Sequence, residues 1–257
     1  MAHEHEQEEP SRPEGAQGQE PTGPPLNPRG EQWTPAGPIR PVSAEDIIQR
    51  LELNAQATVA DAAPLGLAAF AATTFTLGAI EAGWAAISSQ GSPIIAFVSS
   101  ITGYIATLPM LIIFGGIAQF IAAMWSFRKG STFWATFLGV YGSLYGVLGL
   151  GILVSGLTGI PVGILQPELG TAVAVAMFAL IGAYLTFAAT GISAVVVGTA
   201  GFLTVSLALL SASFFMGGAF LTIMAAGYAS IVSALLAFYA SAALVINSTL
   251  GREVMPY

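Results

Sequence analysis

Long apolar segments follow one another along the chain from residue 64 onward, and each is close to the roughly 20 residues that cross a bilayer as a helix. Short stretches containing glycine, proline or serine separate them, and such residues favour turns. The segments span residues 64–87, 109–127, 132–154, 171–190, 194–214 and 223–247. The pattern predicts an all-α integral membrane protein, with six transmembrane helices in a domain that covers residues 61–257.

The first 60 residues have the opposite character. Residues 1–41 contain nine prolines, abundant Gly, Gln and Glu, and almost no aliphatic side chains. They cannot bury enough apolar area to offset the entropy lost on ordering, so we expect residues 1–60 to form a disordered cytoplasmic tail. Within it we expect a short amphipathic helix near residues 44–54, capped by Ser43 and lying at the membrane surface. The apolar side of that helix consists of Ile47, Ile48 and Leu51.

Residues 88–108, between the first and second apolar segments, do not fit the simple count of spans. They are apolar, but they contain Pro93 and Gly103 and are too short to add a helical hairpin. An even number of extra spans would be needed to keep both termini on one side of the membrane. We therefore expect an extracellular helical cap or a re-entrant segment here.

The distribution of charge predicts the orientation in the membrane. Charged residues make up only 8% of the chain and apolar residues 54%, with a mean hydropathy of +0.75, whereas soluble domains carry roughly a quarter charged residues. The net charge of -7 belongs mostly to the tail and indicates no nucleic-acid surface. Six spans place every Lys and Arg on one side, so the positive-inside rule predicts cytoplasmic termini in a multi-pass protein of the plasma membrane. These basic residues are Arg12, Arg29, Arg40, Arg50, Arg128, Lys129 and Arg252.

The chain lacks the residues of most catalytic and cofactor sites. It has no cysteine, which excludes disulfides, thiol nucleophiles and thiolate-bound metals. Its two histidines, His3 and His5, lie in HEHEQEE, which is more typical of a solvated tail than of a metal site. The membrane region contains no P-loop, dinucleotide fingerprint or nucleophile elbow. We expect no enzyme activity, no cofactor and no metal, which leaves a transporter, a pore or a structural membrane protein.

Small residues recur at helical spacing in the third apolar segment, where Gly142 and Gly146 are four residues apart in GVYGSLYG. Such spacing lets two helix backbones approach closely. Packing within one protomer is the favoured interpretation over a contact between subunits, and periodicity alone leaves both open.

Three ordered motifs connect the chain to a known family. DAAPLGLAAF at residues 61–70, GGIAQFIAAMWSFRKGSTFWATFLGVYGS at residues 115–143 and FYASAALVINSTLGREVMP at residues 238–256 carry the likeness. They resemble the opening signature, the second and third helices, and the last helix of the acetate uptake transporter family. That family includes bacterial acetate-succinate permeases and fungal acetate and ammonia-export proteins. The resemblance covers about residues 58–257.

The resemblance implies six transmembrane helices per protomer and a homo-hexamer in the lipid bilayer, with a separate pathway in each protomer. It also implies a hydrophobic constriction, which would consist of Phe70, Tyr141 and Leu203. The expected function is transport of small monocarboxylates, acetate first and also succinate, by proton symport or in a channel-like manner. Export of ammonia or another small solute, and a membrane scaffold without transport, are the alternatives.

The remaining candidate site residues lie in the first two helices. The signature residues are Asp61, Pro64, Leu65, Gly66 and Leu67, and the candidate polar groups for the solute are Thr73, Thr74 and Gln119. Asp61 can cap the first helix, whose free N–H groups could equally meet a carboxylate solute. The chain departs from the family where Asp61-Ala62 replaces Asn-Pro and where Ser126 replaces Glu. These departures bear on substrate identity and coupling rather than on the fold.

Glu81, in TTFTLGAIEAGWAA, is an acid inside the first apolar segment. It follows Phe70 by eleven positions, which on a helix is a rotation about 20° from the same face and a rise of roughly 16 Å. A carboxylate facing lipid is costly, so we expect Glu81 to face the pathway or an interface. It is a candidate proton-linked group. The alternative is a hydrated acid near the outer interface, with Trp84 in the aromatic belt.

Overall fold

A computed structural model describes residues 43–57, 60–84, 107–159 and 169–257. The tail predicted for residues 1–41, and residues 88–106 of the unusual segment, lie outside the described residues. Within the described ranges, six helices are long and apolar enough to cross a membrane. The prediction of an all-α membrane protein with six spans is confirmed.

The helices follow the apolar segments closely. The second span, Thr107–Arg128, contains a π-helix in the middle, which the sequence did not predict. In chain order the elements are α1 (Ala44–Ala57), α2 (Ala63–Glu81), the π-helix η1 (Met110–Ala118), α5 (Gln119–Arg128), α6 (Thr132–Thr158), α7 (Leu169–Ala189), α8 (Ala194–Phe215) and α9 (Phe220–Leu250).

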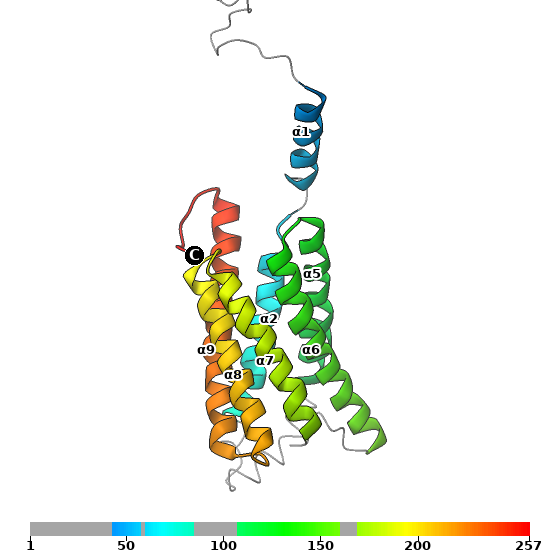
Figure 1. Cartoon of the computed structure of the whole chain (residues 1–257), viewed down its shortest axis with the longest axis vertical. Helices are drawn as coiled ribbons and strands as arrows, with labels where there is room; N and C mark the ends of the chain where they lie inside the picture. The colour runs from blue at the N-terminus through cyan, green and yellow to red at the C-terminus, as the bar shows by residue number, and fades with distance from the viewer. Residues whose placement is uncertain (1–42, 58–59, 85–106, 160–168) are drawn as a thin grey trace, which may run out of the picture. The chain divides into compact units, whose positions relative to one another are not determined.

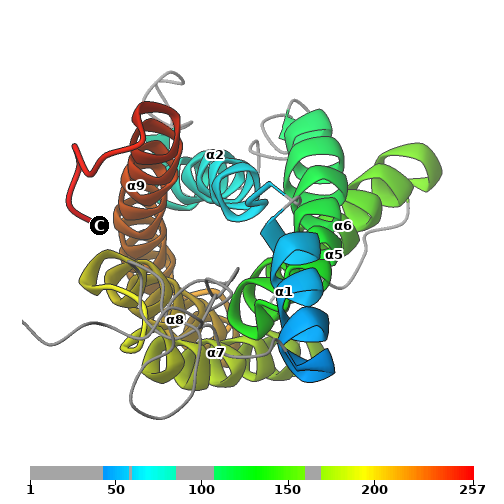
Figure 2. The same ribbon diagram turned by 90° about the horizontal axis from the view of Figure 1, so that it is seen from above.

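Residues 55–257 form one compact unit, in which the spans lie side by side and run up and down (Figure 1). Helix α2 packs against α9 on one side and against η1, α5 and α6 on the other, while α8 lies between α7 and α9. A smaller contact between α6 and α7 completes a ring of helices, which Figure 2 shows end-on. Helix α2 begins, α5 leads into α6 and α9 finishes at the same end of the bundle (Figure 1). We call this end the Asp61 end. The opposite end, where α2 finishes, is the Glu81 end.

The contact between α2 and α9 is a close approach of two backbones at glycine. A Cβ atom on Gly78 would lie 2.8 Å from the carbonyl oxygen of Gly227, and one on Gly227 would lie 2.7 Å from the carbonyl oxygen of Gly78. Further along the same contact, the Ser241 hydroxyl donates to the carbonyl oxygen of Pro64 at 2.8 Å. Without a hydrophobic force between helices in lipid, packing and hydrogen bonds of this kind hold the spans together.

The glycine stripe of α6 serves packing within the chain. A Cβ on Gly142 would lie 3.2 Å from the backbone nitrogen of Phe120, and Gly146 faces Gly116 of η1 with 3.6 Å between its Cβ position and the Gly116 Cα. The interpretation that these glycines pack helices of one protomer is therefore confirmed.

Helix α2 is shorter than predicted. The apolar segment runs to residue 87, but the helix ends at Glu81, because Gly83 adopts a φ of 81°, in the left-handed region. A left-handed residue cannot continue an α-helix, and glycine adopts this conformation at the lowest steric cost. Glu81 is consequently the last helical residue rather than an interior one.

Helix α1 begins where the sequence indicates. The Ser43 hydroxyl accepts from the backbone N–H of Asp46 at 3.0 Å, and the Asp46 carboxylate accepts from the backbone N–H of Ser43 at 3.0 Å. The second of these bonds lowers the pKa of Asp46. The side chains of Ile47, Ile48 and Leu51 are exposed. The location of this helix at the membrane surface stays a prediction.

The α2–α9 crossing predicts that Gly227→Ala destabilises the protein. The added methyl group would overlap the backbone of α2, and such overpacking typically costs about 1–3 kcal/mol. Gly156→Ala is the matched control, because a Cβ on Gly156 meets nothing within 4 Å. Thermal unfolding in detergent should show a lower midpoint for Gly227→Ala only, and equal midpoints would contradict the crossing.

Candidate functional site

A cluster of buried aromatic rings from α2 and α6 fills the middle of the bundle. The Phe70 ring centroid lies 5.2 Å from that of Phe137 and 6.2 Å from those of Tyr141 and Tyr145. Phe70 and Tyr141 are both fully buried, and Leu203 of α8 belongs to the same apolar core. The structure thus brings the three predicted constriction residues into one core. Phe137 and Tyr145, which the sequence did not single out, belong to the cluster as well.

Hydroxyl groups lie beside these rings on the α2 side. Thr74 and the Tyr145 phenol are hydrogen-bonded to each other across 71 positions of sequence. Thr73 is 0% exposed, and its hydroxyl has no hydrogen-bond partner among the described residues. Gly115 of η1 is packed against it, with a Cβ position 2.8 Å from the Thr73 hydroxyl oxygen. A buried donor without a partner is rare and favours a role in binding.

A second set of hydroxyls lies where α6 meets α7 and α8. The Tyr141 phenol donates a long hydrogen bond of 3.5 Å to the carbonyl oxygen of Phe178. The Thr186 and Thr204 hydroxyl oxygens are 3.2 Å apart, and a Cβ on Gly182 would lie 2.8 Å from the Tyr141 oxygen. No motif pointed to these threonines. The hydroxyls of Thr186 and Thr204 donate to the carbonyl oxygens of Gly182 and Ala200, four residues earlier in their own helices. Such bonds are ordinary within helices, so no signal in the sequence indicated that these two threonines lie side by side.

Gln119 has a structural position. Its side chain is 0% exposed and lies where η1 passes into α5. Its amide nitrogen can donate to the Gly115 carbonyl at 3.1 Å while its oxygen accepts from the Gly142 N–H at 3.3 Å. In this orientation the amide joins the second span to α6. Because its hydrogen-bonding groups are already paired, it is less available to a solute than the Thr73 hydroxyl is.

The signature residues at the start of α2 mostly make packing contacts. Pro64 lies in the first turn, Leu67 is fully buried, and Leu65 is 49% exposed on the outside of the bundle. A Cβ on Gly66 would meet the side chain of Leu138 of α6 at 3.0 Å or less. The missing side chain at residue 66 therefore makes room for a neighbouring helix.

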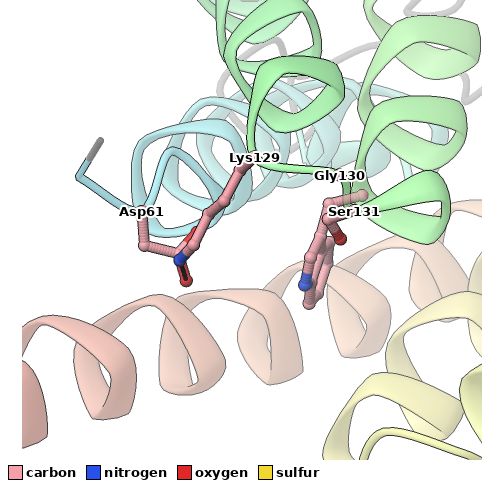
Figure 3. Close-up of a pocket in the computed structure, with 5 residues that line it drawn as sticks. Asp61, Lys129, Gly130 and Ser131 are labelled. Atoms are coloured by element: carbon pink, nitrogen blue, oxygen red, sulfur yellow. Dashed lines mark ion pairs between the residues drawn. The ribbon is translucent and has the colours of Figure 1, made fainter. Parts of the chain in front are cut away.

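Asp61 has two roles at the start of α2. One carboxylate oxygen accepts from the Ala63 N–H at 3.0 Å, as a cap. The other lies 2.9 Å from the Lys129 ammonium nitrogen, and Figure 3 shows the two side chains meeting between the start of α2 and the α5–α6 turn. A pocket of about 350 Å³ lies beside the pair. It is lined by Asp61, Lys129, Gly130, Ser131 and Trp134.

The C-terminal segment folds back at the same end. The Asn247 oxygen accepts from the backbone N–H groups of Val254 and Met255, and its amide nitrogen donates to the Met255 carbonyl at 2.8 Å. Burial raises the pKa of Tyr257, and the negative charge of Asp61 raises it further. The asparagine of the third motif is thus a structural residue that holds this segment.

Glu81 lies at the far end of α2. One of its carboxylate oxygens, Oε2, is buried and has no hydrogen-bond partner among the residues described. Trp84 follows it, 42% exposed, with its ring 5.9 Å from that of Phe75. Glu81 therefore directs a carboxylate oxygen into the protein, which fits the expectation that it does not face lipid.

Comparisons with protein families, individual proteins and solved structures each found a family or protein that this chain is similar to. The profile of the GPR1/FUN34/yaaH family matches residues 47–252. An uncharacterized protein of Methanothermobacter thermautotrophicus is 31% identical over 205 residues, covering 77% of this chain and 90% of that protein. Acetate permease A of Emericella nidulans is 36% identical over 86 residues, 34% of this chain, and the match spans only 24% of the permease. The structure of the bacterial acetate channel SatP matches with a TM-score of 0.64 and 28% identity, over 77% of this chain and 99% of that one.

Proposed function

Because the chain belongs to the GPR1/FUN34/yaaH family, we propose that it transports small monocarboxylates across a membrane, with acetate as the first expected solute. The names of two relatives support this choice, since one is an acetate permease and the other an acetate channel. The observation that carries it in this chain is the buried aromatic cluster inside a bundle of membrane-spanning helices, with the Thr73 hydroxyl beside it and unpaired among the described residues.

The aromatic cluster would act as the gate. Phe70, Tyr141 and Leu203 are apolar or aromatic and buried, and an apolar constriction opposes the passage of water and ions. A small acid could pass if the rings move and if hydroxyl groups of the protein form the hydrogen bonds that the acid loses when it leaves water. Thr73 is the best placed of these hydroxyls, because its oxygen is buried, unpaired among the described residues and three positions after Phe70.

The orientation follows from charge. Arg128 and Lys129 lie in the α5–α6 turn, and Arg252 follows α9, so the basic residues of the described membrane region share the Asp61 end. The positive-inside rule assigns this end, with both termini, to the cytoplasm. Proton coupling, a second solute such as succinate and assembly as a homo-hexamer complete the proposal, on the basis of the family resemblance.

The central test is uptake of labelled acetate into proteoliposomes that contain the purified protein. We expect uptake above that of empty vesicles, and faster uptake when the outside is more acidic if protons are coupled. Ammonium flux in its place would support the export alternative. Absence of both fluxes would contradict transport and leave the scaffold, whose partner binding should depend on residues 1–60.

Thr73→Val tests the role of the Thr73 hydroxyl. Valine has nearly the same shape, and removing an unpaired buried hydroxyl should leave stability unchanged or raise it by about 1 kcal/mol. Acetate uptake should nevertheless fall, by up to about tenfold. A tenfold change corresponds to about 1.4 kcal/mol of lost binding free energy. Thr76→Val is the control, because the Thr76 hydroxyl is already paired with the Ala72 carbonyl. Equal uptake by both variants would remove Thr73 from the pathway.

Glu81→Gln tests the proton link. An ionised carboxylate near the pathway repels acetate, whereas a protonated one can donate a hydrogen bond to it. If Glu81 couples protons, wild-type uptake rises as pH falls, and Glu81→Gln, which is uncharged throughout, loses that rise. Initial uptake rates at a series of external pH values measure this. An unchanged pH profile in the variant would remove Glu81 from proton coupling.

A further inference from the structure

We propose that the Asp61 carboxylate is a built-in competitor of anionic solutes at the Asp61 end, because it occupies the Lys129 ammonium group that an incoming carboxylate would otherwise bind. This inference rests on the proposed function, since it names a group that sets the affinity for the acid. The competing group belongs to the chain itself, so removal of its charge should tighten solute binding.

Both oxygens of the Asp61 carboxylate are engaged. Oδ1 accepts from the Ala63 N–H at 3.0 Å, and Oδ2 lies 2.9 Å from the Lys129 nitrogen. A free carboxylate binds to ammonium groups and backbone N–H groups of a protein. One internal carboxylate therefore uses both partners, and a solute that arrives there must displace it.

The pair is placed where displacement is feasible. The Lys129 and Asp61 side chains are 34% and 41% exposed, so water screens their attraction, and exposed pairs of this kind are weak. The adjacent pocket of about 350 Å³ has room for a two-carbon acid with several waters, each of which takes roughly 30 Å³. A buried pair in a closed site would not exchange its carboxylate in this way.

The pocket is also connected to the aromatic cluster. Trp134 lines the pocket, and its ring lies 6.3 Å from that of Phe137 in an edge-to-face contact. The Phe137 ring in turn lies 5.2 Å from that of Phe70. A solute held at Lys129 would thus lie beside Trp134, two ring contacts away from Phe70 of the proposed gate.

Other charged groups at this end are less suited to the role. Arg128 lies 5.6 Å above the ring of Trp125, and Arg252 is exposed after the end of α9. The Tyr257 phenol near Asp61 carries no positive charge in either protonation state, and burial and the Asp61 charge raise its pKa. Lys129 is the cation that lines the pocket within the part of the chain that the structure describes.

Asp61→Asn is the informative variant. Asparagine keeps an oxygen that can accept from the Ala63 N–H, so the start of α2 is preserved while the charge is lost. The dissociation constant for acetate, measured on purified protein in nanodiscs by saturation-transfer NMR of the acetate methyl group, should fall about two- to five-fold, the scale of one exposed ion pair. Thermal unfolding of the same samples should show an unchanged midpoint.

Two further variants complete the experiment. Asp61→Asn combined with Lys129→Gln removes the ammonium group as well, and should return the dissociation constant to the wild-type value or above. Glu253→Gln removes an exposed carboxylate from the C-terminal segment at the same end and should change little. If Asp61→Asn leaves acetate binding unchanged, or if Glu253→Gln shifts it equally, competition by Asp61 is overturned.

Flux measurements separate this inference from the proposed function. Uptake and efflux in proteoliposomes together sample both orientations, and Asp61→Asn should lower the apparent KM without changing the maximal rate. Loss of all flux in the wild type would contradict transport, while the binding measurement would still decide the role of Asp61. Normal wild-type flux with an unchanged KM and dissociation constant in Asp61→Asn would contradict the competitor alone.

Discussion

The close approach of α2 and α9 at Gly78 and Gly227 is the contact on which the ring of helices depends. In a bilayer each helix already satisfies its own backbone, so spans associate only as well as their surfaces fit. Glycine at both positions lets the first and last spans meet backbone to backbone. Helix α2 can then pack on η1, α5 and α6 with its opposite side, which directs Phe70 into the interior.

The interior that results contains two kinds of hydroxyl group. Some join helices: the Ser206 and Ser230 oxygens are 2.7 Å apart, and Ser233 donates to the Thr199 carbonyl at 2.7 Å. Their hydrogen-bonding capacity serves the fold, because an unpaired polar group is costly in an apolar surrounding. Thr73 departs from this rule within the described residues, and the departure coincides with the aromatic cluster. Among the described residues, Thr73 is thus the buried hydroxyl without a partner, and it lies beside the proposed gate.

The two ends of α2 carry its acids in different surroundings. Asp61 is neutralised by Lys129 and capped onto the helix, at a partly exposed position beside a pocket. Glu81 ends the same helix with a buried oxygen that lacks a partner in the part of the chain described. Within the described ranges, Asp61 therefore has a cation beside it and Glu81 has none. This difference is why we assign solute competition to Asp61 and proton linkage to Glu81.

The sequence by itself determined the number and order of the spans and the cap at Ser43, because hydrophobicity and capping are local properties. The interior position of Phe70 was expected from the family resemblance. The sequence did not reveal that α2 stops at Glu81, since one left-handed glycine decides that. Only the tertiary structure assigned Gly142 to a contact within the chain and paired the Gln119 amide with backbone groups. It also left the Thr73 hydroxyl without a partner among the described residues. It alone paired Asp61 with Lys129. Whether a polar group is paired depends on partners far away in the chain, and no local pattern specifies which helices become neighbours.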